Sequence, residues 1–325
     1  MAGRRPMMRA AVADRYGPPE ILRIVQVEKP APAPDEVLVR IHAAAVTMSD
    51  IFIRSGRVTP LLYVPFHLMI GITRPRARIL GFAYAGVVEE TGSAITRFSP
   101  GDEVYGMTGY SLQAYAEFRC AKESETKRHG CLALKPKNLT FAEATAAIYG
   151  GSLALQYADK GNIKPGDRVL IYGASGTSGT MAVQYAKHLG ARVTGVCSGT
   201  NAEFVMSLGA DTVLDYTSVD APPNGATYDF VMDSVGGMRT SSLKTACRRA
   251  LAPGGCYASI DDGDLTLEIA RLDQIRELVE AGAITPVLGH TFPFDQIAEA
   301  HRLVESGHKR GGVAVSIGTG SLQES

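Results

Sequence analysis

A glycine-rich turn constrains the fold of this chain more than any other segment. Three glycines spaced GxxGxxG follow the apolar run Asp167–Tyr172, and a helical pattern and the strand-like run Arg192–Cys197 come after them. In a strand–turn–helix–strand unit the backbone N–H groups and the helix N-terminus can approach a pyrophosphate closely. The spacing therefore predicts a dinucleotide-binding turn, with a purely structural turn of another α/β fold as the alternative. The residues expected to bind the cofactor here are Gly173, Ala174, Ser175, Gly176, Thr177, Ser178 and Gly179.

The second half of the chain alternates helical and strand-like segments. Phe141–Lys160 and Ala202–Leu208 have helical patterns, whereas Thr212–Leu214 and Tyr228–Asp233 read as strands. Strands that alternate with helices of about ten residues indicate βαβ units and a parallel sheet. The predicted fold class is α/β.

The first part of the chain has a different pattern, in which short strand-like runs follow one another. Glu36–His42 alternates apolar and polar residues, and residues 79–106 contain two β-rich runs separated by a turn. Short strands with frequent turns predict a small β-barrel or curled sheet. Arg57–Arg78 is first apolar and then basic, and we interpret it as a loop or a short helix. The C-terminal part predicts one helix, Asp295–Ser306, and a final strand, Gly312–Ile317.

Charge and cysteine content exclude several classes of protein. Lys and Arg total 33, as do Asp and Glu, so no broad field attracts nucleic acid or an anionic membrane, and neither is expected as a partner. Five cysteines without a CxxC motif do not form a disulfide scaffold. The apolar stretch Leu61–Ile72 is too short to cross a bilayer. Because no apolar signal segment follows the N-terminus, the expected location is cytoplasmic.

The second strand of the nucleotide unit bears on the choice of cofactor. NAD-binding sheets end this strand with an acidic residue that holds the ribose diol, but here Cys197 is followed by a turn without Asp or Glu. A missing acid removes the repulsion against a 2′-phosphate, so NADPH is predicted over NADH, although the turn has no Arg or Lys either. The side chains expected to contact the ribose are Ser198, Thr200, Asn201 and Tyr216.

Four phrases together resemble the medium-chain dehydrogenase/reductase superfamily: RFSPGDEVYG (97–106), IKPGDRVLIYGASGTSG (163–179), SLGADTVLDY (207–216) and YDFVMDSVGG (228–237). More narrowly, the chain is similar to the zinc-free, quinone-oxidoreductase-like (zeta-crystallin-like) branch from Met8 to Ile317. The resemblance implies a GroES-like β-barrel domain over residues 1–134, completed by 291–325, and a Rossmann doubly wound parallel sheet over 135–290. It also implies hydride transfer involving nicotinamide, with Asp233 and Val235 beside the cofactor.

The same resemblance predicts that no zinc is bound. Thr47 stands where the zinc-dependent branch has a cysteine, and Gly81-Phe82-Ala83 stands where that branch has Gly-His-Glu. The third ligand, a cysteine, falls near Tyr149, where the chain has no thiol. The only other metal-like group of residues is Cys120, His129 and Cys131, for which ordinary loop residues are the favoured interpretation.

Several residues are candidates for the catalytic group. No GxSxG nucleophile elbow and no YxxxK pattern occurs, which points away from hydrolases and short-chain dehydrogenases. Addition of hydride to a quinone or enone builds an oxyanion or enolate that must be hydrogen-bonded and protonated. Thr47 is the leading candidate for this role. Tyr63, Tyr84 and Tyr149 are further candidates, each with packing in the core as the alternative.

The predicted function is a zinc-independent, NADPH-dependent oxidoreductase that transfers hydride to a small-molecule quinone or α,β-unsaturated carbonyl substrate. The alternatives are an alcohol dehydrogenase or aldehyde reductase, and a non-catalytic NADPH-binding or interaction protein. Phe52 and Gly312 depart from the residues usual in the family, and the segment Asp261–Leu272 is shorter than usual. Within it, Leu265–Ile269 is predicted to replace the strand at which relatives dimerise, which leaves a homodimer open.

Overall fold

The computed structural model describes residues 6–58, 60–237, 240–263 and 265–318. The chain packs as two compact units. Unit 1 comprises Met1–Ile148, Leu267–Arg276 and Leu288–Ser325, and unit 2 comprises Tyr149–Thr266 and Glu277–Val287. Compared with the domain limits expected from the sequence, unit 1 therefore continues into the helix that begins at Phe141, and it takes in a short segment from the later part of the chain.

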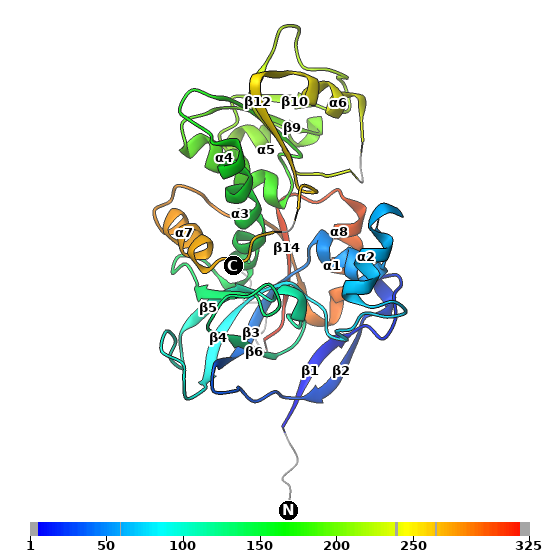
Figure 1. Cartoon of the computed structure of the whole chain (residues 1–325), viewed down its shortest axis with the longest axis vertical. Helices are drawn as coiled ribbons and strands as arrows, with labels where there is room; N and C mark the ends of the chain where they lie inside the picture. The colour runs from blue at the N-terminus through cyan, green and yellow to red at the C-terminus, as the bar shows by residue number, and fades with distance from the viewer. Residues whose placement is uncertain (1–5, 59, 238–239, 264, 319–325) are drawn as a thin grey trace, which may run out of the picture. The chain divides into compact units, whose positions relative to one another are not determined.

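Unit 2 contains a five-stranded sheet in which all neighbouring strands are parallel, in the order β10-β9-β8-β11-β12. Helix α4 packs on β8 and β9, α5 on β9 and β10, and α6 on β12 (Figure 1). The strands and helices of this part of the chain are α3 (Phe141–Gly161), β8 (Arg168–Tyr172), α4 (Thr177–His188), β9 (Arg192–Cys197), α5 (Ala202–Ser207), β10 (Thr212–Asp215), β11 (Tyr228–Asp233), α6 (Ser242–Arg249) and β12 (Leu251–Ser259).

The hydrophobic pattern explains why this sheet is buried on both faces. β8 and β11 are almost continuously apolar, and Val169, Leu170 and Phe230 lie in the core of unit 2. Runs of this kind are typical of parallel strands covered by helices on both faces. The chain leaves β8 for β9 and β10 on one side, and later adds β11 and β12 on the other side. The order of the strands therefore reverses between β8 and β11, where α/β sheets of this kind bind their ligands.

Unit 1 is built around a curled, mostly antiparallel sheet of seven strands. One edge of β3 pairs with β4, while its other edge pairs with β6 over residues 36–40 and with β14 over residues 43–45. The elements of unit 1 are β1 (Met7–Val12), β2 (Arg23–Glu28), β3 (Glu36–Ala45), α1 (Met48–Ser55), α2 (Pro60–Ile70), β4 (Ala83–Thr91), β5 (Glu103–Met107), β6 (Phe118–Lys122), β7 (Cys131–Leu134), α7 (Ile269–Glu280, which continues into unit 2), β13 (Leu288–Pro293), α8 (Ile297–Ser306) and β14 (Gly312–Ser316).

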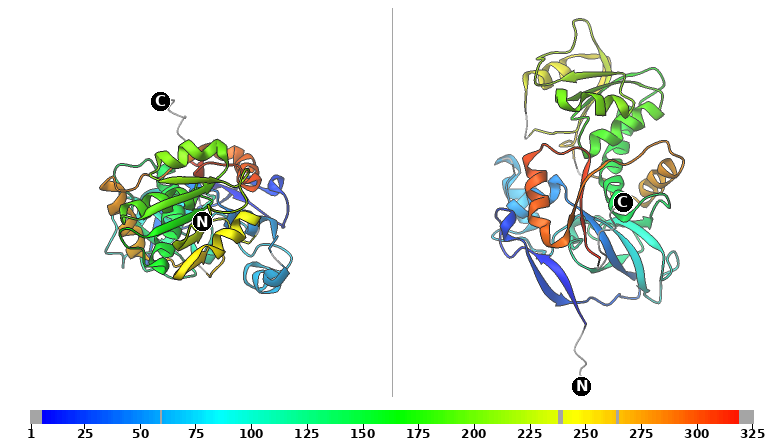
Figure 2. Two further views of the ribbon diagram at one scale, coloured as in Figure 1. Left: turned by 90° about the horizontal axis from the view of Figure 1, so that it is seen from above. Right: turned by 180° about the vertical axis from the view of Figure 1, so that it is seen from behind.

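Figure 2 shows the same ribbon from above and from behind, and from behind the C-terminal strand β14 can be followed beside α8. The core of unit 1 includes Val39 and Ile41 of β3, Tyr84 of β4 and Val304 of α8. The C-terminal segment thus completes the sheet begun by the first part of the chain, as expected from the sequence.

The predicted strand at Leu265–Ile269 is wrong. Residues 265–268 form neither strand nor helix, and Ile269 begins α7. The backbone N–H of Ile269 donates a hydrogen bond to the carboxylate of Glu125, as at a helix start, instead of pairing with a sheet edge. A β-propensity pattern of five residues is too short to overcome such a tertiary contact.

Candidate functional site

The glycine-rich turn between β8 and α4 has the geometry of a dinucleotide cradle. Gly173 has a φ of +82°, which L-residues with side chains rarely adopt. Its N–H and that of Ala174 both donate to the carbonyl oxygen of Val196, which ties the turn to the end of β9. At Gly179 an added Cβ would overlap the carbonyl oxygen of Gly173 and lie 2.8 Å from the Cα of Ala174. Glycine at this position therefore allows α4 to pack directly on the turn.

The middle glycine of the turn leaves room for a ligand. A Cβ at Gly176 would meet only one atom within 4 Å, the carbonyl oxygen of Gly173 at 3.4 Å. Gly176 is also the N-cap of the 12-residue helix α4, and as a glycine it has no side chain that could cap this helix end. The first-turn N–H groups and the positive end of the helix dipole are suited to bind a pyrophosphate. The residues present thus fit the dinucleotide that the fold implies.

The predicted ribose-binding residues form one cluster at the end of β9. The Ser198 and Thr200 hydroxyl oxygens lie 3.0 Å apart, and Asn201 Nδ2 donates to Ser198 Oγ at 3.0 Å. Asn201 also reaches Ser175 Oγ of the glycine turn, at 3.4 Å. Tyr216, which is half exposed, is linked to the same strand end through its backbone N–H, which donates to Cys197 O.

A carboxylate that we did not predict approaches this cluster from the neighbouring strand. A Cβ on Gly199 would lie 2.6 Å from Oδ2 of Asp215, the last residue of β10. Hydrogen bonds from the Thr217 hydroxyl and N–H hold the pKa of Asp215 below its usual range, so the carboxylate is ionised at neutral pH. The sequence pattern placed the next residue, Tyr216, at the ribose, but it did not reveal the carboxylate, because β9 and β10 become neighbours only in the sheet.

The loop after β11 joins the same edge of the sheet. Val235 contacts the glycine turn, because a Cβ on Gly173 would lie 2.6 Å from Val235 Cγ2. Asp233 is buried, and its Oδ1 accepts from the N–H of Val235 at 3.0 Å. Its Oδ2 pairs with Lys244 Nζ at 2.6 Å and accepts from the Tyr257 hydroxyl at 3.0 Å. Both oxygens are engaged within the protein, so Asp233 positions the loop that carries Val235.

In unit 1, the buried side chain of Thr47 is fixed at the start of α1. Its hydroxyl donates to Asp50 Oδ2 at 2.7 Å, and its N–H donates to the same oxygen at 2.8 Å. The N–H of Asp50 donates back to Thr47 Oγ1 at 3.4 Å, which completes a capping box. The Thr-x-x-Asp spacing is a sequence signature of this motif, so Asp50 was recognisable before the structure was known.

Burial raises the pKa of Asp50 to about 6, although the hydrogen bonds from the Thr47 hydroxyl and N–H partly oppose this effect. The Tyr115 hydroxyl donates to Ala45 O at 3.2 Å. Since Asp50 is mainly ionised at neutral pH, the Thr47 hydroxyl proton points toward Asp50, and an oxygen lone pair of Thr47 stays available. If Asp50 were protonated, the Thr47 hydroxyl would be able to donate its hydrogen bond to another acceptor.

The three tyrosines proposed as further candidates lie in different surroundings. Tyr84 is completely buried in the core of unit 1, below the Arg119 guanidinium, and its hydroxyl is sealed from solvent. Tyr63 is half exposed on α2, with its ring 4.1 Å from that of His67. Tyr149 is the first residue of unit 2 and is partly buried in α3. Neither Tyr63 nor Tyr84 forms a hydrogen bond with Thr47 in the part of the chain that the structure describes.

The cysteines of unit 1 are poor metal ligands in this structure. Burial raises the pKa of Cys120 to about 11 and that of Cys131 to about 12, so both remain thiols at neutral pH. Metal binding requires the thiolate. Within the described ranges, no three His, Cys, Asp or Glu side chains come together in a way that could hold a metal ion.

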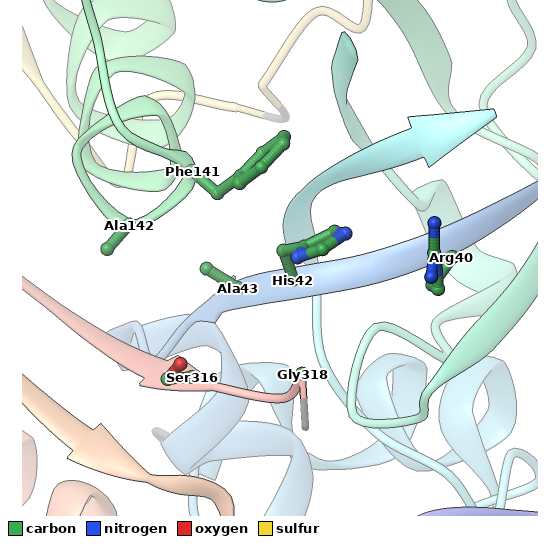
Figure 3. A pocket seen from close by; sticks show the side chains of 7 residues that line it. All are labelled: Arg40, His42, Ala43, Phe141, Ala142, Ser316 and Gly318. Carbon is green, nitrogen blue, oxygen red and sulfur yellow. The ribbon is translucent and has the colours of Figure 1, made fainter. Parts of the chain in front are cut away.

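Unit 1 also contains a hollow of about 370 Å³ between β3, the start of α3 and the end of β14. Figure 3 shows its lining, in which the rings of His42 and Phe141 are stacked at 4.5 Å and Arg40 lies further along β3. None of the predicted site residues lines it.

Comparison with known proteins agrees with this architecture. Residues 33–158 match the alcohol dehydrogenase GroES-like domain, and residues 179–282 and 264–315 match two models of a zinc-binding dehydrogenase. The mitochondrial NAD(P)H oxidoreductase RTN4IP1 of Bos taurus is 34% identical, over 97% of this chain and 90% of its own. The chloroplastic NADPH-dependent alkenal/one oxidoreductase of Arabidopsis thaliana is 30% identical, and the match covers 95% of this chain and 79% of the relative. The structure of the quinone oxidoreductase of Coxiella burnetii superposes with a TM-score of 0.84 at 26% sequence identity. The superposition covers 96% of this chain and 100% of that structure's chain.

The fold and the glycine turn thus define an oxidoreductase that uses a nicotinamide cofactor. The chain belongs to the medium-chain dehydrogenase/reductase superfamily, and its relatives include quinone-oxidoreductase-like members. The predicted pairing of a GroES-like domain with a Rossmann-type parallel sheet is confirmed. No helix in the described part of the chain is both long and apolar enough to span a membrane.

Proposed function

We propose that this protein is a zinc-independent reductase that uses NADPH to reduce a quinone or an α,β-unsaturated carbonyl compound. The observation that carries the proposal is the open glycine turn, in which Gly176 forms the N-cap of α4 without a capping side chain of its own, at the point where the strand order reverses. The printed names of relatives, an alkenal/one oxidoreductase and a quinone oxidoreductase, support this substrate class.

When bound, the nicotinamide supplies the hydride. The protein's own residues have two tasks. The turn 173–179 holds the pyrophosphate by its backbone, and the cluster at Ser198–Asn201 holds the adenosine ribose. Thr47 and Asp50 handle the proton. When Asp50 is protonated, the Thr47 hydroxyl can give its proton to the reduced substrate and receive the Asp50 proton in its place, which leaves Asp50 ionised.

The proposal is tested by following NADPH oxidation with a panel of quinones, enones and aldehydes, before and after dialysis against a chelator. We expect turnover with quinones or enones that survives chelation. Turnover with aldehydes alone, lost on chelation, would instead indicate a zinc-dependent alcohol dehydrogenase. Tight NADPH binding without turnover on any substrate would indicate a non-catalytic NADPH-binding protein.

Replacing Thr47 by alanine is expected to lower kcat about 100-fold, since it removes a positioned proton donor. The loss of the capping box also lowers the free energy of unfolding by about 1 kcal/mol. Thr47→Ser is the matched control, because it keeps the hydroxyl and should retain most of the rate. Steady-state kinetics and thermal unfolding of both variants separate the two effects, and an unchanged rate for Thr47→Ala removes Thr47 from the mechanism.

The preference for NADPH rests on the absence of an acidic residue directly after β9 and on the hydroxyl and amide groups of Ser198, Thr200 and Asn201. Isothermal titration with both cofactors tests it. Clearly tighter binding of NADH would contradict the preference.

Asp215 is expected to limit that preference. Its ionised carboxylate beside Gly199 would repel a 2′-phosphate, so Asp215→Asn should tighten NADPH binding about three- to tenfold and change NADH binding little. Asn retains the acceptor for the Thr217 hydrogen bonds. Asp229→Asn, on β11 of the same sheet and paired with Arg168, serves as the control. Equal effects on both cofactors would show that Asp215 acts on the turn and not on the phosphate.

Two further features are proposals as well. We keep the cytoplasm as the predicted compartment, although relatives include a mitochondrial and a chloroplastic oxidoreductase. Imaging of the tagged protein in cells tests the predicted compartment.

Whether the protein forms a homodimer is tested by light scattering.

A further inference from the structure

Helix α2 exposes an apolar surface that no other part of unit 1 covers. Five large apolar side chains on α2 and just after it are between 44% and 69% exposed: Tyr63, Val64, Leu68, Met69 and Ile72. We call these five residues the α2 patch. They make up about half of the exposed large hydrophobic side chains found in the described residues. Scattered apolar residues at a protein surface are normal, but a contiguous group indicates an interaction site.

The helix is attached to unit 1 through His67, against whose ring the ring of Tyr63 also packs at 4.1 Å. His67 is buried against the ring of Tyr16, and the Tyr16 hydroxyl donates to Gly71 O at 2.6 Å. Among the described helices and strands, none packs extensively against α2. Figure 1 shows α2 next to α1 at the edge of unit 1. The anchoring contacts involve Tyr16, His67 and Gly71, which leaves the other side chains of the α2 patch exposed: Val64, Leu68, Met69 and Ile72.

The chain segment that contains α2 carries charge of a single sign. Residues 51–88 contain five Arg and no Asp or Glu. Of these arginines only Arg54 is buried, and Arg57, Arg74, Arg76 and Arg78 are exposed. Arg78 is paired with Asp14, whereas the guanidinium groups of Arg57 and Arg74 have no ion-pair partner among the described residues. The zero net charge of the chain, from which we predicted no membrane partner, does not describe this local surface.

We propose that the α2 patch docks on the surface of an anionic lipid bilayer. Apolar side chains next to unpaired arginines match a headgroup–acyl boundary, where the guanidinium binds lipid phosphate and the apolar side chains enter the acyl region. The 11 residues of α2 span roughly 16 Å, about half the thickness of the hydrocarbon core, so the helix lies in the interface and does not cross it. Charge complementarity selects lipid as the occupant over a second copy of the chain, whose own α2 patch carries the same positive charge.

The absence of tryptophan from the sequence allows a direct test. Leu68→Trp places a single tryptophan in the α2 patch, and Met206→Trp places one at an exposed apolar site on α5 as the matched control. The full-length variants are mixed with vesicles of phosphatidylcholine, with or without phosphatidylglycerol. We expect a blue shift of the emission, and quenching by brominated lipid, for Leu68→Trp with the anionic vesicles only. Met206→Trp should not respond.

Flotation of the protein with the same vesicles gives an independent measurement. Val64→Asp should lower the bound fraction at least about tenfold, because it places a charge in the acyl region. Arg74→Gln should weaken binding, whereas Arg249→Gln, an exposed arginine on α6, should not. Circular dichroism confirms folding of each variant, and NADPH titration without vesicles tests the cofactor site separately.

Three results would overturn the proposal. One is no binding to either type of vesicle, and another is equal binding to neutral and anionic vesicles. The third is a blue shift of Leu68→Trp without vesicles that grows with protein concentration, which would identify a second copy of the chain as the occupant of the α2 patch.

Discussion

Alanine in place of Gly179 is expected to raise the dissociation constant for the dinucleotide about 100-fold, which corresponds to about 2.7 kcal/mol. The added methyl group would overlap the carbonyl oxygen of Gly173 and crowd the Cα of Ala174, so α4 must move away from the turn. The helix N-terminus then no longer points at the pyrophosphate. Overpacking of this kind also lowers the free energy of unfolding by about 1–3 kcal/mol.

Two other glycines separate the contributions to this effect. Gly176 has an ordinary φ of −80°, and a Cβ added there would meet only one atom, at 3.4 Å. The Gly176→Ala variant should therefore fold normally. It should still weaken dinucleotide binding, because the methyl group fills space that the ligand needs. Gly318→Ala in unit 1, where the nearest atom lies at 3.5 Å, should change neither property. Calorimetric titration and thermal unfolding of all three variants provide the data. Wild-type affinity in Gly179→Ala would show that the turn does not bind the cofactor.

The second large effect concerns stability in acid. His301 of α8 is completely buried, and both of its ring nitrogens lack a hydrogen-bond partner among the described residues. Burial, assisted by the nearby Arg54 guanidinium, lowers the pKa of His301 to about 3. The unfolded chain therefore binds a proton at this histidine below pH 6.5 while the folded chain does not. Stability is present above pH 6.5 and is lost as the pH falls toward 3, by about 1.4 kcal/mol per pH unit.

His301→Leu should abolish this slope, because leucine fills a similar volume without a titrating group. The free energy of unfolding is measured with denaturant at several values between pH 4 and pH 7. Asp50 contributes a slope of opposite sign up to about pH 6, since its pKa is raised, so the variant must be compared with the wild type at each pH. His308→Leu, at an exposed position, is the control. Parallel curves for His301→Leu and the wild type would show that His301 is protonated in the folded protein.

The strands of the nucleotide unit could be predicted accurately from local pattern. Arg192–Cys197 and Tyr228–Asp233 were predicted with the limits that the structure shows for β9 and β11. Their apolar runs are bounded by turn residues, so the pattern itself marks both ends. The same reasoning predicted a strand wrongly at Leu265–Ile269. A run of five residues carries little information, and here the Glu125 carboxylate accepts a hydrogen bond from the N–H at which a helix begins.

The site was predictable where it lies on one continuous segment. The turn 173–179 and the cluster Ser198–Asn201 are each local, and the structure brings them together through the Asn201–Ser175 contact. Asp215 was missed because it comes to the ribose turn from another strand. The role of Tyr84 was left open because a tyrosine in an apolar run reads the same whether its hydroxyl is sealed or exposed.

The sequence by itself determined the α/β class, the position of the dinucleotide turn and the membership of the superfamily, since all three depend on the spacing of residues along the chain. Only the tertiary structure decided which charges meet. It brought Asp215 to Gly199, buried Asp50 and His301 so that their pKa values shift in opposite directions, and turned the α2 patch outward. The physical reason is that desolvation and Coulomb interactions depend on distances through space, which sequence spacing does not specify.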